Sequence, residues 1–248
     1  KRQSIRQVNT TKMNSFINSP FLFPIYSKTK TLSIVTAGMV ACLLISIGAS
    51  GQGRPIGFWR SHLPYNNVRS IATDGVTIYA ATNLSMSTNN VVTKEWYQYA
   101  KTEGMSDLQT SCIGYDVYSG TVILAYQNGN IDLFSDNSFY NIPDLKRRSV
   151  SGSKAIHHIY TENGYAYLST GIGVIVIDLK NREIKETYTF YRDAQEVETT
   201  GFTAAGSYYY VSTVNGLYRT SKNNPNPQIP SSWQLIDTGV RLEYIASV

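Results

Sequence analysis

The chain has 248 residues, which is long enough for one large all-β domain behind a leader, and its formal charge at neutral pH is +5. The whole excess lies in the first 50 residues, which hold six cations and no acid, so the rest of the chain carries 16 cations against 17 acids. This balance excludes the broad basic surface that nucleic-acid binding requires, and we expect no nucleic-acid partner.

The N-terminal segment has the features of a secretory signal peptide. Two lysines precede an uncharged apolar stretch over residues 31–49, and small residues follow it. This order predicts an extension and leader over residues 1–51, with cleavage near Gln52. Two alternatives stay open, because the stretch is long enough for a retained membrane anchor and because the residues before Cys42 loosely match a lipid-attachment motif.

Residues 52–248 contain four similar segments in tandem, which we expect to form one domain. An apolar marker recurs at Ile71, Ile113, Ile159 and Phe202, and a turn marker recurs at Ser85, Gly129, Gly173 and Gly216. The first marker repeats every 42 to 46 residues and the second every 43 or 44, so two independent registers agree. Because Ser85 replaces the glycine, we expect the first segment to be the least regular.

Each segment is expected to contain four strands, and the third shows them most clearly. Residues 155–160 and 165–169 flank Asn163-Gly164, a pair typical of a two-residue hairpin turn. A β-branched run over 174–179 and an alternation of charged and apolar residues over 183–190 complete the unit. Four strands in such a period predict the blades of a β-propeller, whereas a β-sandwich would not require its units to resemble one another.

Tryptophan-led segments mark the last strand of a blade. Residues 96–99 and 233–236 fall at this place, and Trp59 heads a similar segment near the N-terminus. We expect this N-terminal strand to complete the final blade of a ring, which would remove exposed edges. A fifth unit begins at Ile245, so the sequence predicts a truncated all-β propeller of about four blades and the start of a fifth.

The sequence contains no motif that is typical of catalysis, phosphate binding or metal binding. Of the three histidines, His157 and His158 are neighbours on a predicted strand, so they face opposite sides and cannot share a site, and His62 lies far from both in the sequence. We therefore predict no enzyme activity, no catalytic residue, no cofactor site and no metal site, and the ligand-binding residues stay unassigned.

Three acids recur at the same turn of successive segments, namely Asp74, Asp116 and Glu162. Their recurrence places them at one rim, where a propeller enzyme could hold paired carboxylates. Acidic and amide side chains are also favoured in turns because they hydrogen-bond the local backbone. Turn chemistry explains these acids without catalysis, and we favour it.

Other polar and aromatic features have simple structural explanations. Cys112 lies in an apolar run and is expected to be a small buried residue, and the run Lys146–Arg148 is expected to be a solvated loop. Residues 128–132 resemble a calcium loop only faintly and are better explained as a turn. Tyrosines such as Tyr165 and Tyr167 fall at strand positions, where packing is the expected role.

Four phrases together resemble the N-terminal propeller of the PorZ family, a component of the type IX secretion system of Bacteroidetes. They are WRSHLPYNN at 59–67, IYAAT at 78–82, AYQNGNID at 125–132 and GVIVIDL at 173–179. The likeness covers about residues 54–248. Ligand-sensor propellers of hybrid two-component regulators share the Tyr-Ala-Ala-Thr phrase and the Asn-Gly-Leu phrase, the latter at 215–217.

The resemblance implies an exported protein of the periplasm or the outer-membrane cell surface, with two propellers and a C-terminal secretion-signal domain. It implies a non-catalytic scaffold that binds other type IX secretion and sortase components and anionic lipopolysaccharide, and that assists the sortase-mediated attachment of cargo. The alternatives are a ligand-sensing periplasmic propeller of a hybrid two-component regulator and a carbohydrate-active propeller enzyme. No ligand residue of the family can be carried over to this chain.

Overall fold

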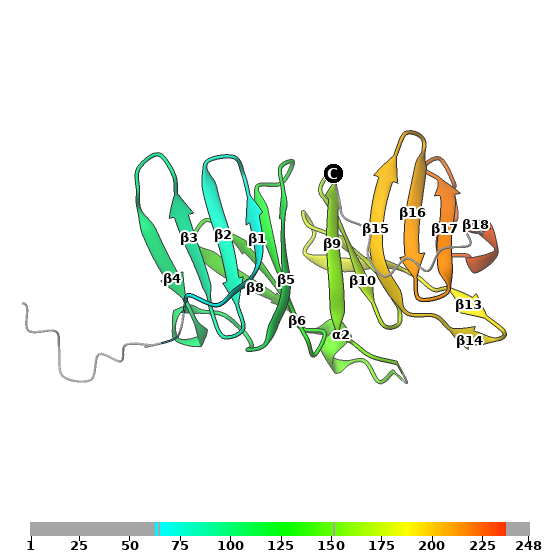
Figure 1. Cartoon of the computed structure of the whole chain (residues 1–248), viewed down its shortest axis with the longest axis horizontal. Coiled ribbons are helices and arrows are strands. Elements are labelled where there is room, and N and C mark those ends of the chain that lie inside the picture. The colour runs from blue at the N-terminus through cyan, green and yellow to red at the C-terminus, as the bar shows by residue number, and fades with distance from the viewer. Residues whose placement is uncertain (1–62, 64, 151, 237–248) are drawn as a thin grey trace, which may run out of the picture. The chain divides into compact units, whose positions relative to one another are not determined.

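Four antiparallel sheets of four strands follow one another along the chain (Figure 1). The computed structural model describes residues 63, 65–150 and 152–236, all within one compact unit, Arg60–Val248. The expected leader, His62, the segment headed by Trp59 and the fifth unit at Ile245 lie outside the described residues.

Each sheet is a simple meander and corresponds to one predicted blade. Blade 1 consists of β1 (Val68–Thr73), β2 (Thr77–Thr82), β3 (Met86–Asn90) and β4 (Trp96–Tyr99). Blade 2 consists of β5 (Thr110–Asp116), β6 (Thr121–Tyr126), β7 (Ile131–Ser135) and β8 (Ser138–Ile142). Blade 3 consists of β9 (Ile156–Glu162), β10 (Tyr165–Thr170), β11 (Gly173–Asp178) and β12 (Glu183–Tyr188). Blade 4 consists of β15 (Thr199–Ala205), β16 (Tyr208–Thr213), β17 (Gly216–Ser221) and β18 (Gln234–Ile236).

Short elements connect successive blades, and one more connects β17 to β18 within blade 4. They are η1 (Lys101–Glu103), α2 (Asp144–Arg147), β13 (Tyr191–Arg192), β14 (Gln195–Glu196) and η2 (Pro230–Ser232). The strands β13 and β14 pair with each other as a separate two-stranded ribbon between blades 3 and 4. Within the part of the chain that the structure describes, no helix has both the length and the apolar character needed to cross a membrane.

The two repeat registers found in the sequence are confirmed strand by strand. In every blade the apolar marker stands three residues after the first paired residue of the inner strand, and a β-bulge separates the two. The four markers accordingly pair with the same position of the second strand, namely Ala80, Leu124, Leu168 and Val211. The bulge is a property of the pairing that the sequence pattern does not reveal.

The turn marker follows a threonine that organises the turn in three blades. The Thr170 hydroxyl accepts the N–H of Ile172 at 3.2 Å and donates to the carbonyl of Gly173 at 2.7 Å, and Thr82 and Thr213 make equivalent bonds. Blade 2 has Tyr126 at this position and forms a different turn. The expectation that blade 1 is the least regular was therefore wrong, because Ser85 supports the same threonine turn without a glycine.

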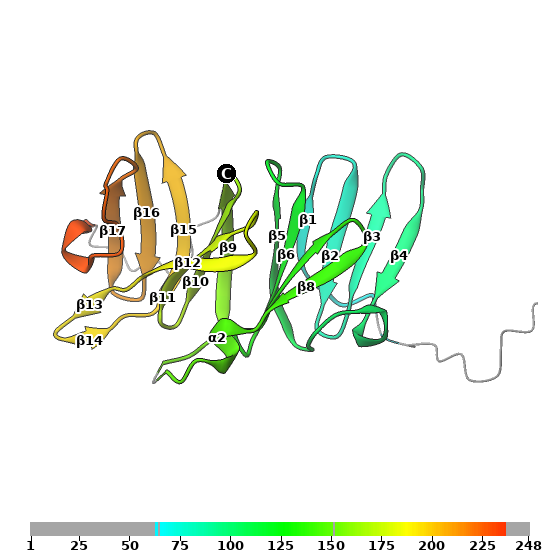
Figure 2. The ribbon, with the colours of Figure 1, turned by 180° about the vertical axis from the view of Figure 1, so that it is seen from behind.

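Successive blades pack against each other through their inner strands and sheet faces. The strands β1, β5, β9 and β15 lie side by side in that order (Figures 1 and 2). Three apolar clusters fill the spaces between the sheets, one between each pair of neighbouring blades. At Gly114 of β5, an added Cβ would stand 2.7 Å from Ile159 of β9, so the inner strands approach closely where blade 2 has glycine.

The first blade keeps one face uncovered by any described residue. Ile71 is 67% exposed, whereas the equivalent Ile113 and Phe202 are 6% and 0% exposed because blades 1 and 3 cover them. Within the described ranges, the four sheets therefore form an arc of a propeller and do not close a ring.

One of the bonds between blades 3 and 4 is made by the hydroxyl of Thr199. Thr199 accepts the N–H of Thr170 at 3.0 Å and lies 2.9 Å from the carbonyl oxygens of both Thr170 and Gly173. Thr199 is fully buried, so water cannot take the place of its hydroxyl. If the hydroxyl is removed, these backbone groups lose a hydrogen-bond partner. Thr110 of blade 2 bonds the Thr82 carbonyl of blade 1 in the same way.

Replacing Thr199 with valine is expected to lower the free energy of unfolding by about 1–3 kcal/mol, because the buried backbone groups lose their partner. Urea denaturation followed by fluorescence measures this change. Thr203→Val, on the same strand, is the control and should change stability by less than about 0.5 kcal/mol. Equal stabilities for the two variants would contradict the proposed role of the hydroxyl.

Candidate functional site

The two described histidines lie on opposite faces of β9, as their adjacency predicts. His157 is exposed and its Nε2 lies 2.5 Å from the Glu198 carboxylate. His158 is buried and its Nδ1 accepts the N–H of Phe202 at 3.4 Å, which joins β9 to β15. Burial lowers the pKa of His158, so its ring is held in the neutral form. Among the residues that the structure describes, no group of three acidic, histidine or cysteine side chains is placed to hold a metal ion.

Two of the three recurring acids serve their own turns. Asp74 accepts the N–H groups of Val76 and Thr77, and Asp116 accepts that of Ser119 at 2.7 Å. These bonds confirm the explanation by turn chemistry for Asp74 and Asp116.

Glu162 behaves differently from the other two acids, and turn chemistry was the wrong explanation for it. Its carboxylate lies 2.5 Å from Lys222 Nζ and accepts the Tyr209 hydroxyl at 3.1 Å. Both partners come from blade 4. The side chain of Glu162 is one methylene longer than that of an aspartate. It therefore bridges blades 3 and 4, whereas Asp74 and Asp116 each bind the backbone of their own turn.

The run Lys146–Arg148 is only partly the solvated loop expected from the sequence. Lys146 Nζ lies 2.5 Å from Asp107, and Asn128 donates to the same carboxylate at 2.7 Å. The side-chain oxygen Oδ1 of Asn128 accepts the N–H of Asn130 at 3.0 Å, so residues 128–132 form a turn, as predicted. Burial by itself would raise the pKa of Asp107, but the bonds from Lys146 and Asn128 outweigh it and lower the pKa to about 2.

This lowered pKa makes stability depend on acidity. Because Asp107 releases its proton more readily in the folded chain than at its ordinary pKa of 3.8, its stabilisation is present above about pH 4 and is lost as the pH falls towards 2. Between about pH 4 and pH 2 we expect the free energy of unfolding to fall less for Asp107→Asn than for the unmodified chain. Urea denaturation at several pH values measures this difference. The control is Asp136→Asn, at an exposed turn, and identical pH profiles for all three proteins would refute the assignment.

Cys112, Tyr165 and Tyr167 all pack in apolar clusters between blades, as the sequence predicts. Cys112 packs against the apolar cluster between blades 2 and 3, and burial raises the pKa of its thiol to about 12. Tyr167 stacks on Phe202 with ring centres 4.4 Å apart. Tyr165 is partly buried against the cluster between blades 3 and 4 and also lines an open cleft, with Lys185 Nζ 4.3 Å from its ring centre.

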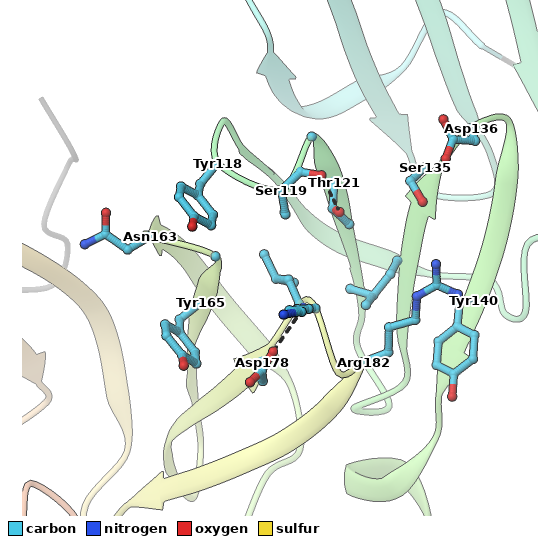
Figure 3. A pocket seen from close by; sticks show the side chains of 15 residues that line it. Tyr118, Ser119, Thr121, Ser135, Asp136, Tyr140, Asn163, Tyr165, Asp178 and Arg182 are labelled. Carbon is cyan, nitrogen blue, oxygen red and sulfur yellow. Dashed lines mark hydrogen bonds between the residues drawn. The ribbon is translucent and has the colours of Figure 1, made fainter.

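This cleft lies between blades 2 and 3 and has a volume of about 650 Å³ (Figure 3). It opens among the hairpin turns β5–β6 and β7–β8 of blade 2 and the turns β9–β10 and β11–β12 of blade 3. The side chains that contribute rings, charges or amides are Tyr118, Tyr140, Tyr165, Asp136, Asn163, Asp178, Lys180 and Arg182. Leu133 and Leu179, both buried, contribute apolar surface to the same cleft.

The cleft exists because blade 3 has short side chains where blade 4 has long ones. Counted from the turn marker, Tyr209 and Lys222 of blade 4 occupy the positions of Ala166 and Leu179 in blade 3. Tyr209 and Lys222 reach back to the Glu162 carboxylate and fill the space between blades 3 and 4. Ala166 and Leu179 are too short to make the same bridge to blade 2, so that space stays open.

The backbone of two turns fixes the walls of the cleft. Asn163 and Gly164 have φ angles of 53° and 82°, the left-handed pair that the sequence predicted for a two-residue hairpin. An added Cβ at Gly164 would stand 3.1 Å from the Tyr118 ring, so Tyr118 lies directly over this glycine. Arg182 also adopts a positive φ, of 59°, and its guanidinium lies 5.1 Å from the centre of the Tyr140 ring.

The sequence did not single out the residues that give this cleft its chemistry. Tyr118, Tyr140 and Arg182 lie in or beside turns of two different blades, between 22 and 64 residues apart along the chain. The one available signal was the repeat register, which aligns Ala166 and Leu179 with larger residues of the next blade. Only the packing of blade 3 on blade 2 turns that difference into a cleft.

Comparison with known proteins identifies a family over most of the described residues. The model of the family described as "TSS9, PorZ, N-terminal beta-propeller domain" matches residues 78–234. This range contains blades 2 and 3 complete and most of blades 1 and 4. No curated protein matches the chain.

Solved structures agree with the fold. PorZ of Porphyromonas gingivalis, described as an essential bacterial surface component of the type IX secretion system, is 20% identical, with a TM-score of 0.65 over 75% of this chain. The extracellular domain of BT4673 from B. thetaiotaomicron, described as a hybrid two-component system, is 14% identical, with a TM-score of 0.53 over 75% of this chain. The chain spans 25% of the first structure and 24% of the second, and at these identities both support the fold alone.

Proposed function

Since the chain belongs to the family of PorZ N-terminal β-propeller domains of the type IX secretion system, we propose that it is a non-catalytic binding and scaffold module of that system. The observation that carries this proposal is the family match over residues 78–234. The cleft between blades 2 and 3 supports a binding role, because it is an open space lined by aromatic and charged side chains.

The finer part of the proposal concerns location and partners. We propose that the protein is exported to the periplasm or the outer-membrane surface and works with other type IX secretion and sortase components. There it would assist the attachment of cargo to anionic lipopolysaccharide. The description of the P. gingivalis protein as a bacterial surface component supports this location.

Two described features support a module that performs no reaction. Asp74 and Asp116, which a propeller enzyme could use as paired acids, are bound to the backbone of their own turns. Asp178, which lines the cleft, accepts the N–H groups of Lys180 and Asn181 and the Asn181 side-chain amide. These bonds give each carboxylate a structural role in its own turn, which explains the acids without catalysis.

A second candidate function is a ligand-sensing propeller of a two-component regulator. The similarity of its fold to the extracellular domain of BT4673 favours this alternative. The two functions differ in what the loss of the protein changes in the cell.

Deletion of the gene in the organism that encodes it distinguishes them. The secretion proposal expects type IX cargo to stay unattached to the cell surface, as measured by fractionation and immunoblotting, with transcription otherwise unchanged. Normal cargo attachment together with a changed response of specific transcripts to a carbohydrate would support the sensor instead. As a complementary measurement, we expect the purified protein to bind anionic lipopolysaccharide in low salt, and failure to bind would remove that partner from the proposal.

A further inference from the structure

The cleft between blades 2 and 3 presents two cationic side chains that no described acid neutralises. Among the described residues the ion pairs are Lys146 with Asp107, His157 with Glu198 and Lys222 with Glu162, and neither Lys180 nor Arg182 takes part in one. Two acids, Asp136 and Asp178, line the same cleft. Asp178 is held by backbone and amide donors, and neither acid forms an ion pair with Lys180 or Arg182. The cleft therefore has positive charge available for a ligand.

Arg182 is held in place before any ligand arrives. Its φ of 59° is uncommon for a residue with a Cβ, and its guanidinium lies 5.1 Å from the centre of the Tyr140 ring. Figure 3 shows the Arg182 side chain beside Tyr140 at one wall, with Tyr118 and Tyr165 at the opposite wall. A fixed guanidinium beside aromatic rings is suited to bind a carboxylate whose neighbouring atoms are apolar.

Exposed valines continue from the cleft across the same end of blades 1 and 2. Val117 and Tyr118, on the β5–β6 turn, are 82% and 80% exposed. On blade 1, Val76 and Val92 are 44% and 71% exposed, and the N–H of Val91 bonds the Val76 carbonyl, so these turns meet. Figure 1 shows the β1–β2, β3–β4 and β5–β6 turns at one end of the blades.

Branched aliphatic side chains at turn tips are suited to a protein surface and offer little to a sugar, which binds to flat rings and hydrogen-bonding groups. Exposed apolar groups around a site with tyrosine and arginine are typical of protein interfaces, where these two residue types contribute most of the binding energy. The valines therefore favour a protein as the occupant over a glycan.

We propose that this end of blades 1 to 3 docks an acidic segment of a protein partner. A carboxylate of the segment binds between Arg182 and Lys180 in the cleft, and its apolar side chains cover Val117 and the valines of blade 1. The proposal rests on the proposed function in that both make the propeller a binding module, and it adds the site and the chemistry of the partner.

The test is a selection of random heptapeptides, displayed on phage, against the immobilised full chain. We expect the selected peptides to be enriched in aspartate or glutamate next to apolar residues. Synthetic versions of these peptides should bind about tenfold more weakly to Arg182→Gly, since a charge-assisted hydrogen bond is lost. Tyr118→Ala should also weaken binding.

Two features of these variants separate binding from folding. Glycine tolerates the left-handed backbone at position 182, so Arg182→Gly should keep or raise the melting temperature while binding weakens. Arg148→Gly, which removes an exposed arginine outside the cleft, is the matched control and should bind like the unmodified chain.

Three outcomes would overturn the proposal. They are the absence of any enriched peptide, enriched peptides without acids, and equal binding to Arg182→Gly. Glucuronic acid is tested in parallel, and tighter, Arg182-dependent binding of this sugar acid would replace the protein partner by a carbohydrate. Because the selection uses only the purified chain and has no secretion readout, its failure leaves the result of the gene deletion unaffected.

Discussion

Replacing Asp132 with alanine is expected to lower the free energy of unfolding by about 3 kcal/mol or more, because one buried and two partly buried donors lose their acceptor together. Asp132 is fully buried in β7. Its carboxylate accepts the N–H of Ser106 at 2.8 Å, the hydroxyl of Tyr126 at 2.6 Å and the amide of Asn141 at 2.9 Å. Urea denaturation monitored by circular dichroism measures the loss.

The bonds of Asp132 link three parts of blade 2 and its entry segment. Ser106 precedes β5, Tyr126 ends β6 and Asn141 lies in β8, so one side chain fixes the relative positions of the segment and two strands. Burial, together with the nearby Asp132 charge, raises the pKa of Tyr126, which keeps its hydroxyl protonated and able to donate.

Two further variants test this explanation. Asp132→Asn keeps the shape but replaces one acceptor by a donor, so we expect an intermediate loss of about 1–2 kcal/mol. Asp136→Asn, four residues away and exposed, should change stability by less than about 0.5 kcal/mol. A loss for Asp132→Ala no larger than that for Asp136→Asn would mean that the network is not stabilising.

Replacing Gly173 with alanine is expected to lower the free energy of unfolding by about 3 kcal/mol, by backbone strain and overpacking together. Gly173 has a φ of 115°, and an added Cβ would stand 2.2 Å from the Tyr188 carbonyl oxygen of β12. Because that oxygen belongs to the backbone of a paired strand, it cannot move aside without breaking the ladder. Thermal and urea denaturation both report the loss.

Two other glycines provide graded controls. Gly216 is the equivalent turn marker of blade 4, but its added Cβ would meet only the flexible end of Leu235, at 3.0 Å, so we expect a smaller loss. Gly120 has a φ of 66° and open space around it, which leaves only the backbone cost of about 1 kcal/mol. Equal losses at all three positions would show that the contact with Tyr188 does not matter.

The role of Gly173 can be read from the local sequence, whereas the role of Asp132 cannot. Gly173 was found from the sequence as a turn marker, and its φ and close contact give the physical reason for the glycine. In the sequence, Asp132 stands out only as part of a weak resemblance to a calcium loop and of the family phrase at residues 125–132. Its role as a buried acceptor depends on donors 6 to 26 residues away, which no local pattern reveals.

The cleft between blades 2 and 3 depends on both local and long-range features. The tandem repeat shows which residues are equivalent in successive blades. The sequence alone therefore shows that blade 3 has Ala166 and Leu179 where blade 4 has Tyr209 and Lys222. Whether the smaller pair leaves a cleft depends on what blade 2 places opposite them. The positions of Arg182 and Tyr140, on different blades, could not be inferred from either turn alone.

The sequence by itself determined the all-β class, the four blades, the hairpin at Asn163 and the opposite faces of His157 and His158. These features follow from local periodicity and turn chemistry, which act over a few residues. Only the tertiary structure decided the pairs Lys146 with Asp107 and Lys222 with Glu162, which join residues 39 and 60 positions apart, and the cleft between blades 2 and 3. The physical reason is that each blade is specified by its own strands, whereas contacts between blades depend on side-chain lengths on two facing sheets at once.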